Sequence, residues 1–94
     1  MARTRTHPGE VLREEFLAPL GLSARKVAAD LGVPANRLSD ILRERRSVSA
    51  DTAHRLAAYF GTTPAFWLNL QTAHDLSAAA ALTDYSQVRR FENA

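Results

Sequence analysis

Three polar side chains able to read the edges of bases lie close together in the chain, at Asn36, Arg37 and Asp40. An asparagine amide can pair with adenine, an arginine guanidinium with guanine or a phosphate, and a carboxylate can accept a hydrogen bond from cytosine. Asp40 could instead orient the side chain of Arg37. Together with Ala35, these residues form a candidate base-reading set; the alternative is an ordinary solvated polar face.

Basic residues surround this set, and eleven of the twelve basic residues in the chain are arginine. The planar guanidinium group matches phosphate oxygens and guanine edges better than an ammonium group does. Backbone N–H groups at the start of a helix can also hold a phosphate. The candidate phosphate-contacting residues are Ser23, Ala24, Arg25, Ser39, Arg43, Arg45 and Arg46.

Other chemistries have little support in the sequence. His7, His54 and His74 lie on different segments without a second ligand at a spacing typical of zinc sites, although His74 could pair locally with Asp75. No serine, threonine or aspartate has the surroundings of an activated nucleophile, and no glycine-rich loop is present. The chain contains no cysteine. We therefore expect no enzyme activity, metal or cofactor.

The base-reading set needs a scaffold, and the sequence predicts a helix-turn-helix over residues 23–43. Two helices that cross closely over a short turn need a small residue at the crossing and a glycine in the turn, as Ala28 and Gly32 provide. The shared core would come from Val27, Leu31, Val33, Leu38 and Ile41. A tight helical hairpin without DNA binding is the alternative.

Hydrophobic periodicity and capping residues predict one all-α domain, residues 1–94, with five helices. The expected ranges are residues 8–18, 23–31, 34–43, 49–60 and 63–82. Pro19 and Gly21 would end the first helix, whose inner face would contain Leu20. Pro34 is either an N-cap or a first helical residue. Residues 83–94 form either a frayed tail or a short docked helix.

Partner surfaces are expected on the first and last helices. Glu10, Glu14 and Glu15 make the first helix acidic, either as a solvated face or as a contact for a basic partner. Trp67 is expected in the core, and the far side of the last helix is a candidate dimer seam. Small residues would permit close approach there, namely Ala73, Ala78, Ala80 and Ala81. With no long apolar run, no membrane association is expected.

Residues 7–23, 49–57 and 59–71 resemble the corresponding segments of HigA-type antitoxins, which include the VapI-like group. These proteins belong to the lambda-repressor-like XRE helix-turn-helix superfamily, and the resemblance covers residues 7–76. It implies a five-helix lambda-repressor-like fold and a homodimer that binds a palindromic operator in its own promoter. It also implies a cognate toxin similar to RelE-type ribonucleases.

The leading hypothesis is therefore a cytoplasmic antitoxin that represses its own promoter. One alternative is a stand-alone XRE-type regulator without a toxin. The other is a protein-binding helical module that has lost DNA binding, supported by Ala24, where many relatives have a glutamine that braces a phosphate.

Overall fold

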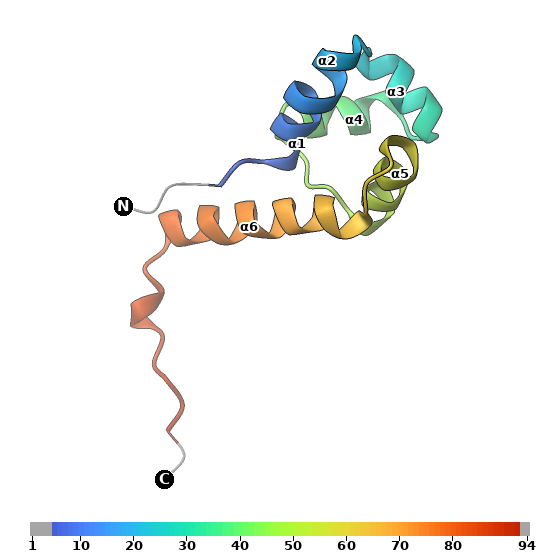
Figure 1. Ribbon diagram of the computed structural model, residues 1–94. Helices are drawn as coiled ribbons and strands as arrows, with labels where there is room; N and C mark the ends of the chain where they lie inside the picture. The colour runs from blue at the N-terminus through green and yellow to red at the C-terminus, as the bar shows by residue number, and fades with distance from the viewer. Residues whose placement is uncertain (1–4, 93–94) are drawn as a thin grey trace.

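The computed structural model describes residues 5–92, and within these residues the chain is all-α, as predicted. Figure 1 shows a body of packed helices from which the far end of the last helix and the tail project. The elements are α1 (Pro8–Val11), η1 (Leu12–Leu17), α2 (Ala18–Leu20), α3 (Ala24–Leu31), α4 (Ala35–Leu42), α5 (Ala50–Phe60), α6 (Pro64–Leu82) and η2 (Tyr85–Gln87).

The elements α1, η1 and α2 form one continuous helix with a π-helical middle. The N–H of Ala18 donates to the carbonyl of Arg13, five residues earlier, and this wider turn accommodates Pro19, which has no N–H. The prediction that Pro19 helps to end the helix is therefore wrong: Gly21, at φ 63°, follows its last residue.

The widened turn also changes the inner face of this helix. Leu12 and Leu17 are five residues apart, and both are buried, as a π turn of more than four residues allows. Leu20, which the regular helical spacing placed inside, is 62% exposed. Its predicted core role is therefore wrong.

The helix-turn-helix consists of α3 and α4 and begins and ends as predicted. The Ser23 hydroxyl accepts the N–H of Lys26 at 3.1 Å, and Gly32 takes the left-handed conformation at φ 75°. Pro34 is extended and is the N-cap of α4 rather than its first residue. The five expected core residues, Val27, Leu31, Val33, Leu38 and Ile41, are all buried.

The last two helices complete the core. Ser49 and Thr63 cap α5 and α6 through their hydroxyl groups, and Gly61 follows α5 in the left-handed conformation, all as predicted. The helix α5 packs on α3 and α6, and α6 also packs on α1. Trp67 is fully buried, as expected, and its indole N–H donates to the Thr62 hydroxyl at 2.8 Å.

Beyond α6 the chain does not dock on the body. Every described residue from Leu82 to Glu92 is exposed, and the only regular structure there is the single 3₁₀ turn η2. Of the two alternatives for residues 83–94, the described part is an exposed tail; residues 93 and 94 lie outside the described residues. None of the described helices combines the length and apolarity that a bilayer crossing requires.

Candidate nucleic-acid interface

The outer face of α4 carries the residues predicted to read bases. Leu38 and Ile41 are fully buried, which fixes the rotation of the helix about its axis. Ala35 and Asn36 are exposed, while Arg37, Ser39 and Asp40 are partly exposed on the same helix. The sequence spacing therefore placed this polar face on the correct side of α4.

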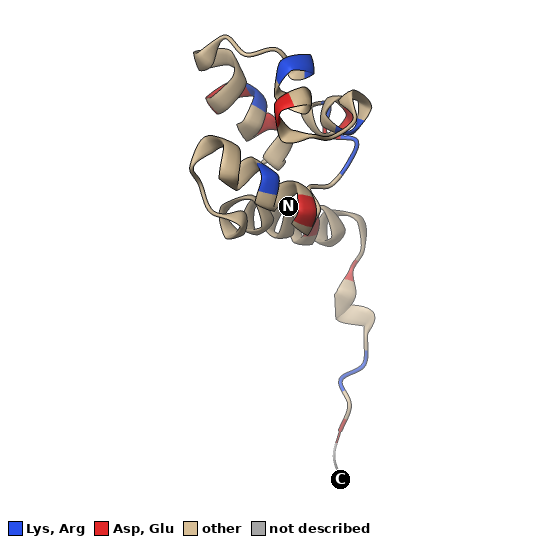
Figure 2. Cartoon of the chain, turned by 90° about the vertical axis from the view of Figure 1, so that its right-hand side faces the viewer, with Lys and Arg blue, Asp and Glu red and all other residues tan. Residues whose placement is uncertain are grey.

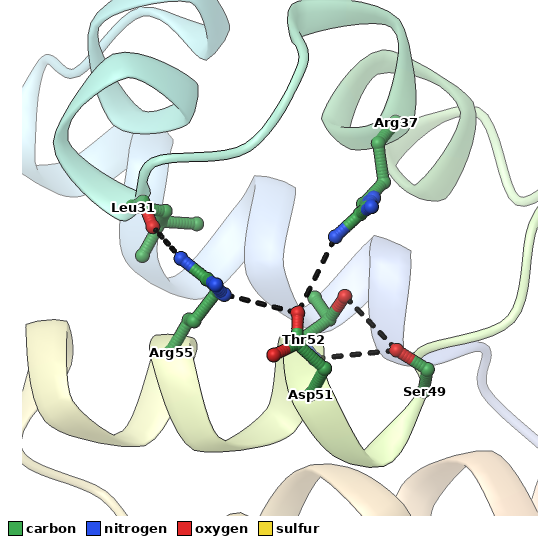
Figure 3. A network of polar contacts seen from close by, with 6 residues as sticks. All are labelled: Leu31, Arg37, Ser49, Asp51, Thr52 and Arg55. Carbon is green, nitrogen blue, oxygen red and sulfur yellow. Dashed lines mark hydrogen bonds and ion pairs between the residues drawn. The ribbon is translucent and has the colours of Figure 1, made fainter.

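Arg37 is held by the next helix rather than by its own. Its Nη1 lies 3.4 Å from Oδ2 of Asp51, which also accepts from Nε of Arg55 at 2.9 Å (Figure 3). Nη1 of Arg55 donates to the Leu31 carbonyl at 2.8 Å and so connects this network to the end of α3. Sequence reasoning missed Asp51 and Arg55, although their spacing of four residues on a helix is typical of an ion pair.

Asp40 does not orient Arg37, and that expectation is wrong. Its carboxylate lies 3.5 Å from Nη2 of Arg46 in the loop after α4. A hollow beside this loop is lined by side chains of α4, the loop and the start of α5. Its lining residues are Arg37, Arg46, Ser47, Ser49, Asp51 and Thr52.

The loop after α4 presents the run of arginines predicted to contact phosphates. The N–H of Glu44 donates to the Ile41 carbonyl, and the N–H of Arg45 donates to the Asp40 carbonyl. These are the two hydrogen bonds of a Schellman motif. Glu44 occupies the left-handed position of this motif at φ 62°. Arg43 and Arg45 flank it and are exposed.

A second brace joins α3 to α5. The Tyr59 hydroxyl donates to Asp30 at 2.6 Å, and Lys26 lies 3.1 Å from the same carboxylate. The hydrogen bond from Tyr59, and next the one from Lys26, lowers the pKa of Asp30.

The start of α3 carries three of the residues predicted to contact phosphates. Ser23 and Arg25 are exposed, and Ala24 packs partly against the core.

His7 and His74 lie on different segments of the sequence, but the fold brings their rings into contact. Their rings meet edge to face with centroids 4.8 Å apart. Nδ1 of His7 accepts the N–H of Gly9 at 2.8 Å, so this imidazole caps α1. Burial, and next the nearby His74, lower the pKa of His7, while Glu44 and Asp75 act in the opposite direction.

His74 contacts the segment before the first helix rather than its neighbour Asp75. His74 places Nδ1 2.8 Å from the Arg5 carbonyl, and Asp75 accepts from Gln71, so the suggested local pair of His74 and Asp75 does not form. His54 is exposed on α5. Among residues 5–92 no group of three or more His, Asp or Glu side chains is arranged to hold a metal ion.

The acidic residues of the first helix line a groove against α6. Glu10, Glu14 and Glu15 are exposed, and the opposite wall includes Leu70 and Ala73. Across the helical body as a whole, Lys and Arg positions are interspersed with Asp and Glu positions (Figure 2). The acidic groove is thus a local feature, and the body is not divided into an acidic face and a basic face.

The outer half of α6, residues 73–82, carries the alanines of the predicted dimer seam. Ala73 and Ala78 are partly exposed, and Ala80 and Ala81 are exposed. Leu76 and Leu82 are also exposed in this half of the helix. An apolar surface is therefore present where the sequence predicted a seam.

Comparison with known proteins identifies the family. A helix-turn-helix family model matches residues 12–67. Virulence-associated protein I of Dichelobacter nodosus is 55% identical over 73 residues, which are 78% of this chain and 68% of that protein. Antitoxin HigA-1 of Vibrio cholerae is 40% identical over 79 residues, covering 81% of this chain and 74% of that protein.

Solved structures agree with this assignment. Pseudomonas aeruginosa antitoxin HigA, solved with the higBA promoter, has a TM-score of 0.87 at 42% identity and covers 96% of this chain and 97% of that one. Antitoxin GraA has a TM-score of 0.91 at 48% identity, with coverage of 95% and 99%. The chain therefore belongs to the HigA-type, VapI-like group of XRE helix-turn-helix proteins, a class of non-enzymatic DNA-binding regulators and antitoxins.

Proposed function

We propose that this protein is the antitoxin of a type II toxin–antitoxin pair and represses its own promoter by binding a palindromic operator. The observation that carries the proposal is the polar outer face of α4, which the buried Leu38 and Ile41 turn outward. Relatives with the same fold, HigA and GraA, have been solved with promoter or operator DNA.

In this proposal α4 enters the major groove and its exposed face reads bases. Asn36 pairs with adenine and Arg37 with guanine, while Ala35 and Asp40 contact neighbouring bases. Phosphates on either side are held by the start of α3 and by the loop after α4. The phosphate-contacting residues are Ser23, Ala24, Arg25, Ser39, Arg43, Arg45 and Arg46.

Single substitutions on α4 test the base-reading role. We expect Arg37→Ala and Asn36→Ala each to weaken binding to the protein's own promoter by roughly 1–3 kcal/mol, the range for a lost base contact, and to change binding to scrambled DNA less. Titration of labelled duplexes measures both affinities. Arg89→Ala in the exposed tail is the matched control. Wild-type affinity in both α4 variants would rule out this face as the reading surface.

A homodimer follows from the size of the site, because one helix-turn-helix covers only one half of a palindrome. The outer half of α6 offers the seam, where the alanines allow close approach beside the exposed Leu76 and Leu82. Light scattering on the free protein should return twice the chain mass at micromolar concentration. A monomer mass at high concentration, with and without operator DNA, would contradict the dimer.

The toxin is proposed to be a basic RelE-like ribonuclease that contacts the acidic groove formed by Glu10, Glu14 and Glu15. Proteins that hold RNA carry positive charge, which this groove complements. Co-expression with the product of the adjacent gene tests the pairing. The wild-type protein should relieve the toxicity of that gene product, and a variant with all three glutamates changed to glutamine should relieve the toxicity less. A neighbour that is harmless alone would favour the stand-alone regulator.

A further inference from the structure

A single carboxylate of α5 connects the recognition helix to the rest of the helix-turn-helix. Oδ2 of Asp51 lies 3.4 Å from Nη1 of Arg37 on α4 and 2.9 Å from Nε of Arg55 on α5 (Figure 3). Arg55 then reaches the Leu31 carbonyl at the end of α3. The orientation of Arg37 therefore depends on residues outside α4.

The start of α5 places this carboxylate beside α4, although the Asp51 side chain is 58% exposed. Asp51 lies in the first turn of α5, where the helix dipole favours a negative charge, and Ser49 caps that turn. Arg55 is held beside the turn of the helix-turn-helix because its Nη1 donates to the Leu31 carbonyl at 2.8 Å, close to Gly32. Arg55 and Arg37 thus share one oxygen of Asp51, Oδ2.

The nearest alternative partner on α4 is already occupied. Asp40, three residues after Arg37, has Nη2 of Arg46 at 3.5 Å. In the described part of the chain, Asp51 is the carboxylate that forms an ion pair with Arg37. The side chain of Arg37 is 34% exposed, so it remains open to a ligand on one side.

We propose that Asp51 is a specificity-determining residue that positions Arg37 for base reading, an inference that rests on the proposed DNA-binding function. The contact of Nη1 with Asp51 favours an orientation of the guanidinium in which its other N–H groups can make a bidentate contact with a base edge. It also offsets the charge of Arg37, which lowers the attraction to phosphates of any sequence. Without Asp51, Arg37 would be free to contact phosphates without reading a base.

The test compares Asp51→Asn with a matched control, Asp30→Asn. Both substitutions remove one carboxylate that pairs with a basic side chain of a neighbouring turn or helix, but Asp30 faces Lys26 and Tyr59 and does not contact Arg37. The wild-type protein is first used to enrich its operator from randomised duplexes. Wild type and both variants are then titrated on that operator and on a scrambled duplex at several salt concentrations.

We expect Asp51→Asn to bind scrambled DNA more tightly, with a slope of log K against log salt that is steeper by about one per protomer. Its ratio of operator to scrambled affinity should fall about fivefold or more, the lower end for one bidentate base contact. Duplexes enriched by Asp51→Asn and by Arg37→Ala should lose preference at the same base of each half-site. Asp30→Asn should keep the wild-type ratio.

A double-mutant cycle separates positioning from a general structural role. In an Arg37→Ala background, adding Asp51→Asn should leave the affinity ratio unchanged, and circular dichroism should show wild-type helical content for every variant. The inference is overturned if Asp51→Asn keeps the wild-type ratio, if Asp30→Asn lowers it equally, or if the fall persists in the Arg37→Ala background. A wild-type protein that enriches no sequence would overturn the proposed DNA-binding function and this inference with it.

Discussion

His7 stabilises the start of the first helix through an acceptor nitrogen and not through charge. Its Nδ1 accepts the N–H of Gly9, and the residue is only 4% exposed. A proton on Nδ1 would remove this acceptor and would place a positive charge beside His74. The folded state therefore favours the neutral imidazole, in agreement with the lowered pKa of His7.

This preference predicts a pH dependence of stability. Above the ordinary histidine pKa of 6.5 the His7 side chain is neutral in both states. As the pH falls below 6.5 the unfolded chain binds a proton that the folded chain resists, so the free energy of unfolding decreases until the pH reaches the folded-state pKa. His7→Asn keeps a good N-cap without the titration, and its unfolding free energy should fall less between pH 7 and 5.

Urea unfolding at several pH values measures this difference, and His54→Asn is the matched control because His54 is exposed on α5. The control should follow the wild-type pH profile. Parallel profiles for wild type and His7→Asn would show that His7 is not the titrating group.

Sequence reasoning predicted which residues face outward on α4 but not what they contact. The outward face follows from the helical spacing of Leu38 and Ile41, which is a local property. The partner of Arg37 lies fourteen residues away on another helix. That pairing depends on how α5 packs against α3, which periodicity does not encode. The contact between the rings of His7 and His74 likewise depends on how distant helices pack.

Individual helices were predictable where their ends are specified by local capping chemistry. Ser23, Ser49 and Thr63 each cap a helix with a hydroxyl group, and the glycines after α3 and α5 take positive φ. The first helix was predicted less well because its π turn changes the spacing on which the inner face depends. Gly9 was also missed: an added Cβ would overlap the Ile41 carbonyl oxygen, so the α1–α4 contact requires glycine.

Glu44 provides a test at the scale of a helix end. It follows α4 in the left-handed conformation at φ 62°, which costs a non-glycine residue about 1 kcal/mol. Its contact with Arg13 at 3.6 Å is an exposed ion pair of little net value. We therefore expect Glu44→Gly to raise the free energy of unfolding by about 1 kcal/mol, as measured by chemical denaturation.

The reverse substitution at the end of α5 is the control. Gly61 has φ 75°, and the space that a Cβ would occupy is open, so Gly61→Ala tests backbone strain without a steric clash. It should lower the free energy of unfolding by about 1 kcal/mol. If Glu44→Gly destabilises the protein instead, the Arg13–Glu44 contact stabilises the fold by more than the left-handed backbone of Glu44 costs.

At the scale of the whole molecule, the features proposed to face DNA and those proposed to face protein partners occupy different elements. The candidate reading face lies on α4, and the arginines proposed to contact phosphates lie mainly in the loop after it. The acidic groove and the alanines lie on the first and last helices. The tail projects away from the body and carries Arg89 and Arg90 (Figure 1). This separation predicts that arginines in different places affect DNA binding differently.

The salt dependence of binding measures the arginine contribution directly. If Arg25, Arg43, Arg45 and Arg46 approach phosphates, each protomer neutralises about two to four of them, and a dimer roughly four to eight. Counterion release then gives a slope of log K against log salt near −4 to −7. Because a phosphate contact reads no base, Arg45→Ala with Arg46→Ala should weaken binding to operator and scrambled DNA alike.

The same double substitution should make the slope shallower by about two to four for the dimer, up to one unit for each arginine removed. The lower value is expected if the Asp40 carboxylate, 3.5 Å from Arg46 in the free protein, keeps that guanidinium away from the phosphates. Arg89→Ala with Arg90→Ala removes the same charge from the exposed tail and should leave the slope unchanged. An unchanged slope in the first pair would mean that the loop arginines face solvent or a protein partner. An equal change in both pairs would mean that binding responds to total charge and not to the position of the loop.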